Sequence, residues 1–184
     1  MRKTTILFLA LLSIKATAQV GSDFPAMETE SLTNIVIDIP SDLADKFTIM
    51  GLAYTKASEN DLKTWFEPMF NQFIYKPENP SVFDFSYDVN CYFIPMFTGA
   101  KRPAYQKVMK KLQKTIDKRL QPYVLFYKGP LKEYKKSLNF QGRDLPYFFV
   151  VNPDNEIVYA TYGRYTKKKM QEIVEAVDAA LEMN

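Results

Sequence analysis

The sequence predicts an α/β fold in which a mixed β-sheet carries helices on both faces. The first observation is an alternation of short apolar runs, typical of strands, with longer segments whose apolar residues recur at helical spacing. The second is a pair of strand-like runs near the end of the chain, separated by a tight turn and followed by one more helix. Alternating strands and helices favour parallel pairing, while a hairpin pairs antiparallel, so one sheet should contain both kinds of pairing.

The first 18 residues have the features of a cleavable signal peptide. A basic start precedes an apolar run over residues 4–14, which has the length of a signal core and is too short for a membrane-spanning helix. Ala16 and Ala18 then stand at the spacing that signal peptidase recognises. We therefore expect cleavage after Ala18, export to the periplasm or cell surface, and a single domain over residues 19–184. An uncleaved N-terminal anchor is the alternative.

The first half of the domain should hold two strands and one long helix. A polar lead-in over residues 20–32 precedes strand-like runs over 33–40 and 46–55, and the second run is apolar enough for a buried central strand. The helix should begin at about Glu59, where apolar residues start to recur at helical spacing. Pro68 lies inside this pattern and should kink the helix, because it lacks a backbone donor.

The second half should add a strand, a basic helix, a short strand, a short helix, a hairpin and a terminal helix. The strand spans residues 85–97 and the basic helix 101–120. The short strand spans 123–129 and the short helix 130–140. The hairpin spans 145–163 and the terminal helix 164–184. The residues at 152–155, Asn-Pro-Asp-Asn, favour a turn in the hairpin. Ser58 or Asn60 could cap the long helix, and Thr166 could cap the last one.

Composition excludes several classes of active site. The chain has no His and a single Cys, Cys91, so it can form no intrachain disulfide and no Ser-His-Asp or Cys-His catalytic group. The commonest metal ligand is also missing, and we expect neither a metal nor a cofactor. Without its first 18 residues the chain carries 21 basic and 21 acidic residues, so its net charge gives no reason to expect nucleic-acid binding.

The order of elements resembles the thioredoxin-like superfamily over roughly residues 23–181, which implies a three-layer α/β/α sandwich with a mixed central sheet. "GSDFPAMETESL" resembles the opening of the peroxiredoxin and TlpA-like branch, and "FTIMGLAYT" resembles the strand that leads into the active-site helix. On this resemblance Pro146 matches the cis-proline of the family, preceded by Leu145. A Trp in the long helix, "YFIPMF" and "VVNPDNEIVYATYGRYT" also look like the ATP synthase assembly-factor branch, which lacks the cysteine pair.

The sequence departs from the redox members of this superfamily at the turn before the long helix. When Pro68 is aligned with the helix proline common in the fold, the two cysteine positions fall on Asn60 and Lys63. A shift of three residues places them on Ala57 and Asn60, and neither register contains Cys. Thiol–disulfide exchange needs an attacking thiolate and a resolving partner. We therefore expect a redox-inactive domain that binds or helps to assemble another protein.

A peptide groove beside the turn is the candidate site. An extended peptide can add to exposed backbone without any cysteine. The residues expected to line the groove are Tyr54, Thr55, Asn60, Lys63, Trp65, Leu145 and Pro146. For two of them a purely structural role is the alternative, since Trp65 falls on the apolar stripe of its helix and Pro146 could be architectural.

Two other functions remain open. Cys91 could form mixed or intermolecular disulfides, or it could be an inert strand residue, as buried cysteines usually are. Residues 101–136 hold 12 basic residues against two acidic ones, so this segment could bind an acidic partner, anionic lipid or another anion at a membrane surface. A solvated basic helix face is the alternative for that segment. The sequence leaves the oligomeric state open.

Overall fold

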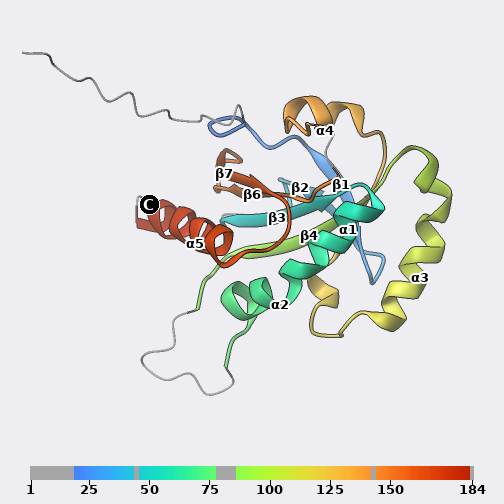
Figure 1. Ribbon diagram of the computed structural model, residues 1–184, viewed down its shortest axis with the longest axis horizontal. Coiled ribbons are helices and arrows are strands. Elements are labelled where there is room, and N and C mark those ends of the chain that lie inside the picture. The colour runs from blue at the N-terminus through green and yellow to red at the C-terminus, as the bar shows by residue number, and fades with distance from the viewer. Residues whose placement is uncertain (1–18, 44–45, 78–85, 142–143, 183–184) are drawn as a thin grey trace, which may run out of the picture.

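The structure is a computed structural model that describes residues 19–43, 46–77, 86–141 and 144–182. Within them, one mixed sheet of seven strands lies between two layers of helices (Figure 1). The predicted signal peptide, residues 1–18, lies outside the described residues. No helix in the described segments is long and apolar enough to cross a membrane.

The strands and helices follow the alternation seen in the sequence. The strands are β1 (Met27–Ser31), β2 (Val36–Ile39), β3 (Thr48–Ala53), β4 (Asn90–Phe97), β5 (Leu125–Lys128), β6 (Tyr147–Val151) and β7 (Ile157–Tyr162). The helices are α1 (Lys56–Leu62), α2 (Phe66–Met69), α3 (Tyr105–Thr115), α4 (Lys132–Ser137) and α5 (Lys167–Glu182).

Strand β3 lies near the centre of the sheet. The strand order is β2-β1-β5-β4-β3-β6-β7, with β3 parallel to β4 and antiparallel to β6. All six residues of β3 are buried, as predicted for a central strand. Gly51 is required there, because an added Cβ would lie 2.6 Å from the ring of Phe148 and 2.9 Å from the side chain of Leu62.

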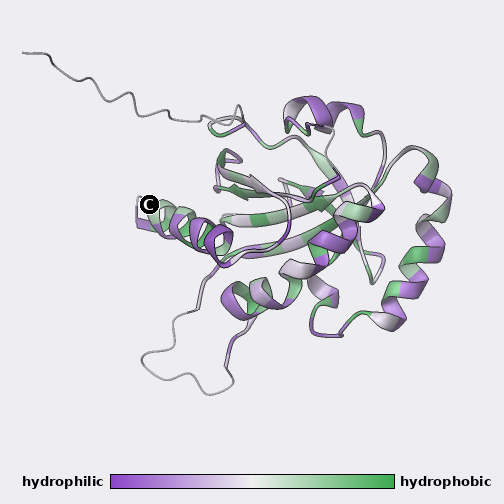
Figure 2. Cartoon of the chain, in the orientation of Figure 1, coloured by the Kyte–Doolittle hydropathy of each residue, from purple (hydrophilic) through white to green (hydrophobic). Residues whose placement is uncertain are grey.

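The two faces of the sheet are covered unequally. Residues of α1, α2, α3 and α5 pack on one face, against Ile49 and Ala53 of β3. Helix α4 and the segment before β1 pack on the other face, against Met50 and Leu52. This division follows from the alternation of side chains along a strand. The central strands are mostly hydrophobic, while α3 and α5 show both hydrophilic and hydrophobic residues, as amphipathic helices do (Figure 2).

The polar lead-in contains a strand, β1, that its sequence pattern did not predict. β1 pairs antiparallel with both β2 and β5. Its inward residues include Thr29 and Ser31, whose polarity hid the alternation. Both are buried without an unmet hydrogen bond: the Thr29 hydroxyl donates to the carbonyl of Ile37 at 2.8 Å, and the Ser31 hydroxyl accepts from the backbone of the β1–β2 turn.

The long helix begins earlier than predicted and is irregular. α1 starts at Lys56, and a 3₁₀ turn (Lys63–Trp65) separates it from α2, after which a π-helical turn (Phe70–Ile74) ends the segment. The 3₁₀ turn comes just before Pro68, whose missing N–H removes one helical hydrogen bond. Regular α-helical hydrogen bonding is therefore interrupted close to Pro68, where the kink was predicted, whereas the predicted start at Glu59 was wrong.

The other predicted elements are present, but the basic helix is shorter than the predicted 101–120: α3 spans Tyr105–Thr115 and follows a 3₁₀ turn (Gly99–Ala104). At the β6–β7 turn, Asn152 N–H donates to the carbonyl of Glu156 at 2.9 Å and Asn155 has a φ of 69°, so the predicted hairpin is confirmed. The hydroxyl of Thr166 accepts a hydrogen bond from the N–H of Lys169 at 3.2 Å, which confirms it as the cap of α5.

Candidate functional site

Two hydroxyl side chains close the turn between β3 and α1. Thr55 is the N-cap of α1, and its hydroxyl accepts a hydrogen bond from the N–H of Ser58 at 3.1 Å. In return, the hydroxyl of Ser58 accepts from the N–H groups of Thr55 at 2.9 Å and Tyr54 at 3.1 Å. This reciprocal arrangement is a capping box, and it satisfies backbone donors that would otherwise be buried and unpaired.

The capping box corrects the register of the turn. Thr55 and Ser58 are three residues apart at the N-terminus of the helix, which is the spacing of a Cys-X-X-Cys motif, and their hydroxyl oxygens lie 3.1 Å apart. Thr55 is half-buried and Ser58 is fully buried. Asn60 and Lys63, which the alignment on Pro68 indicated, are exposed and lie beyond the first turn of the helix. The alignment on Pro68 places the pair five residues further along the chain than Thr55 and Ser58.

Replacing Ser58 by alanine is expected to lower the free energy of unfolding by about 1–3 kcal/mol, because it leaves the N–H groups of buried Tyr54 and half-buried Thr55 without their acceptor. Chemical denaturation followed by circular dichroism measures this loss. Ala57→Ser is the matched control: Ala57 is an exposed neighbour in the same turn, so this change should alter stability by less than about 0.5 kcal/mol. Equal stability of the Ser58→Ala variant and the parent would contradict the assigned role.

Leu145 and Pro146 lie beside the end of β3, as the groove hypothesis required. Leu52 of β3 pairs with Tyr147 of β6, the residue that follows Pro146. The expected cis-proline is absent, however: the cis peptide bond among the described residues is Ile39–Pro40. Pro146 lies immediately before β6, and its carbonyl accepts a hydrogen bond from the N–H of Gly163 at 2.8 Å.

Aromatic rings occupy the space between the turn and the start of β6. The ring of Phe140 stacks on Tyr54, with centroids 5.4 Å apart, and on Tyr147 at 4.4 Å. The ammonium of Lys135 lies 5.6 Å from the centroid of the Tyr54 ring. Burial, with smaller effects from Tyr147 and Asp144, raises the pKa of Tyr54 to about 12. Tyr54 is therefore neutral near pH 7 and contributes a packed ring to this part of the predicted groove.

Trp65 lies in the core rather than on a surface. Its side chain has no exposed area, and its ring packs on Phe148 with centroids 4.2 Å apart. The indole N–H donates to the carbonyl of Gly163 at 2.9 Å, so Trp65 also joins the long helix to the loop after β7. This is the structural alternative that its position on the apolar stripe indicated.

Cys91 lies on β4 and is shielded from solvent. Only 2% of the residue is exposed, and burial raises the pKa of its thiol to about 12. Since the thiolate is the reactive form, this thiol should be inert near neutral pH. It pairs in register with Ile49, five residues before the turn, so it does not belong to the candidate site.

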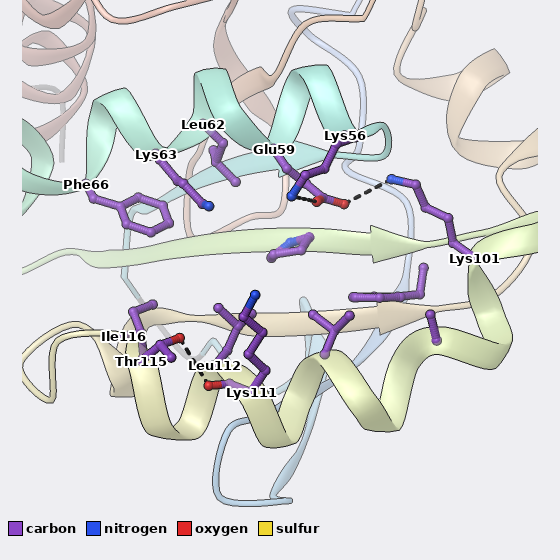
Figure 3. A pocket seen from close by; sticks show the side chains of 14 residues that line it. Lys56, Glu59, Leu62, Lys63, Phe66, Lys101, Lys111, Leu112, Thr115 and Ile116 are labelled. Atoms are coloured by element: carbon purple, nitrogen blue, oxygen red, sulfur yellow. Dashed lines mark hydrogen bonds and ion pairs between the residues drawn. The ribbon is translucent and has the colours of Figure 1, made fainter.

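A second concave region lies between α1 and α3, over one end of β4 (Figure 3). We call it the α1–α3 pocket; its volume is about 360 Å³. Its apolar lining includes Leu62, Phe66, Phe97, Val108, Leu112 and Ile116. Its rim carries the charged residues Lys56, Glu59, Lys63, Lys101 and Lys111. Lys63 is the one residue that this pocket shares with the predicted groove.

The basic segment 101–136 contributes only part of its charge to the pocket. Lys101 pairs with Glu59 at 3.0 Å, while Arg119, beyond the end of α3, pairs with Asp117 at 2.7 Å. Lys107 and Lys114 lie on exposed surface of α3. In the described segments, no group of three or more His, Cys, Asp or Glu residues could hold a metal ion.

Comparison with known proteins supports the fold and nothing finer. No protein-family model matches the chain, and no curated protein matches its sequence. Among solved structures, a putative thiol:disulfide interchange protein DsbE from Chlorobium tepidum has a TM-score of 0.55 and 13% identity, over 86% of this chain and 97% of that one. A 2-Cys peroxiredoxin from Plasmodium vivax has a TM-score of 0.54 and 11% identity, over 89% and 84%.

A third similar structure is BsSco, described as a member of the Sco family of cytochrome c oxidase assembly proteins. Its TM-score is 0.56 and its identity 10%, over 88% of this chain and 95% of that one. The three structures share the thioredoxin-like fold. Together with the mixed sheet between two helical layers, they confirm the fold class that the sequence predicted.

Proposed function

We propose that this chain, whose fold is thioredoxin-like, is an exported domain without redox activity that binds or helps to assemble another protein. The observation that carries the proposal is the pair of hydroxyls at the start of α1. Thr55 and Ser58 occupy the spacing of a Cys-X-X-Cys motif and cap the helix, so this scaffold keeps the turn without a nucleophilic sulfur.

The edge of the sheet offers a surface for a protein partner. In the described part of the chain β2 is an edge strand; its first residue, Val36, is 57% exposed, and Ile35, just before it, is 60% exposed. An exposed strand edge can pair with an extended segment of another protein. The likeness to BsSco agrees with this proposal, because an assembly protein uses the same fold. Export rests on the signal-peptide pattern of residues 1–18.

The redox-inactive part of the proposal is tested by insulin-reduction and peroxidase assays on the purified protein, with the Cys91→Ser variant measured beside it. We expect both proteins to show the background rate only. Activity that survives in Cys91→Ser would refute the proposal, because that variant contains no thiol at all. Activity that disappears in Cys91→Ser would instead establish the single-cysteine alternative.

The anion-binding alternative is favoured by a different observation, the basic rim of the α1–α3 pocket. Anion binding requires no redox chemistry, and one domain can bind both a small ligand and a protein.

A further inference from the structure

We propose that the α1–α3 pocket binds a linear anionic amphiphile, namely a free long-chain carboxylate. This site goes beyond the proposed function, because it needs neither the turn at Thr55 nor a protein partner. Its apolar lining would hold the acyl chain, and its lysines would hold the carboxylate.

The lining of the pocket is suited to an acyl chain. Val108 and Leu112, four residues apart on α3, and Ile116, the residue that follows α3, form one wall, while Leu62 of α1 and Phe66 of α2 form the other. Phe97 of β4 contributes to the floor. The α3 side chains are half-buried, so they present apolar surface to the pocket instead of filling it. A volume of about 360 Å³ lies near the lower end of the range for small-molecule sites, which favours one chain over two.

The charges on the rim select for an anion. Lys63 and Lys111 extend into the space between the two helices from opposite walls (Figure 3). Among the described residues, neither of them forms an ion pair with a carboxylate. By contrast, Lys101 and Lys56 share Glu59, at 3.0 Å and 4.0 Å. The rim therefore has four lysines and one glutamate, with Lys63 and Lys111 available to a ligand.

A carboxylate with a single acyl chain matches both the apolar lining and the basic rim of the pocket. Ammonium groups are compact point charges that pair with one anionic head group, and they require no planar, two-pronged partner. Removing the apolar lining from water contributes the hydrophobic, non-directional part of the binding free energy. An uncharged chain of the same length would bury the same apolar surface but would leave Lys63 and Lys111 without a counter-charge.

The test is a fluorescence titration of the purified protein with cis-parinaric acid, a naturally fluorescent polyunsaturated fatty acid, with palmitate and hexadecanol as competitors. We expect saturable binding, displacement by palmitate, and displacement by hexadecanol that is at least tenfold weaker. The Lys63→Glu/Lys111→Glu variant should bind at least tenfold more weakly than the parent. The matched control, Lys107→Glu/Lys114→Glu, changes the same charge on the exposed surface of α3 and should bind as the parent does.

A second variant tests the apolar part of the site independently of charge. Leu112→Trp should fill the pocket and abolish binding while all four rim lysines remain. Circular dichroism melts of every variant show whether it is folded. Absence of saturable binding by the folded parent would overturn the proposal, as would equal displacement by hexadecanol. Equal losses in the two charge-reversal variants would also overturn it, because they would indicate diffuse attraction to a basic surface.

Discussion

The Trp65→Ala variant is expected to lose about 3–5 kcal/mol of unfolding free energy, a large share of the stability of a domain of this size. The side chain has no exposed area and packs on Phe148 and Tyr165, so its removal leaves a cavity at the centre of the larger core. It also removes the indole donor to the carbonyl of Gly163. Because Trp65 is the only Trp, unfolding should be followed in urea by far-ultraviolet circular dichroism.

Two controls separate the causes of that loss. Trp65→Phe keeps an aromatic ring and removes the hydrogen bond, so we expect a smaller loss of about 1–3 kcal/mol. Tyr75→Ala changes an aromatic residue that is 57% exposed and should shift stability by less than about 0.5 kcal/mol. If Trp65→Ala lost less than about 1 kcal/mol of unfolding free energy, a core role would be contradicted. Trp65 would then be better explained as a residue of the predicted groove.

The Thr55→Cys/Ser58→Cys variant is expected to form a disulfide across the first turn of α1. The two hydroxyl oxygens already lie 3.1 Å apart, with Thr55 in extended backbone and Ser58 in the helix. The helix N-terminus should also hold the pKa of the Cys introduced at position 55 below that of a free thiol. The measurement is a count of reactive thiols in urea with 5,5′-dithiobis(2-nitrobenzoic acid) after air oxidation. It should find Cys91 alone, and two more thiols after reduction.

The control for this variant is Asn60→Cys/Lys63→Cys, which has the same spacing beyond the first turn. Both positions have helical backbone around them and exposed side chains. We expect its introduced thiols to remain reduced under the same conditions. If this pair oxidised and the pair at positions 55 and 58 did not, the register given by the capping box would be wrong.

The architecture could be predicted because apolar periodicity reports which face of each element is buried. It identified the central strand β3, the hairpin of β6 and β7, and the cap of α5 at Thr166. It missed β1, because Thr29 and Ser31 are buried but polar, and their hydrogen bonds become visible only once the β1–β2 turn is formed.

The sites were harder to predict than the fold, because they depend on local irregularity and on distant pairing. An alignment based on Pro68 gave a register five residues later than the N-cap of α1, which is Thr55. The α1–α3 pocket joins segments about 45 residues apart in the sequence, and these come together because β3 and β4 pair in parallel. The Thr-x-x-Ser pattern at positions 55 and 58 was the one local signal that could have identified the turn.

The central claim, that this thioredoxin-like scaffold operates without thiol chemistry, is tested most directly by the reactivity of Cys91 in the native protein. The measurement is the rate of its reaction with 5,5′-dithiobis(2-nitrobenzoic acid) at pH 8, compared with the rate in 8 M urea. The thiol is 2% exposed, and burial raises its pKa to about 12, so the native protein should react at least a hundredfold more slowly. Labelling of one thiol per chain at the same rate with and without urea would contradict the account.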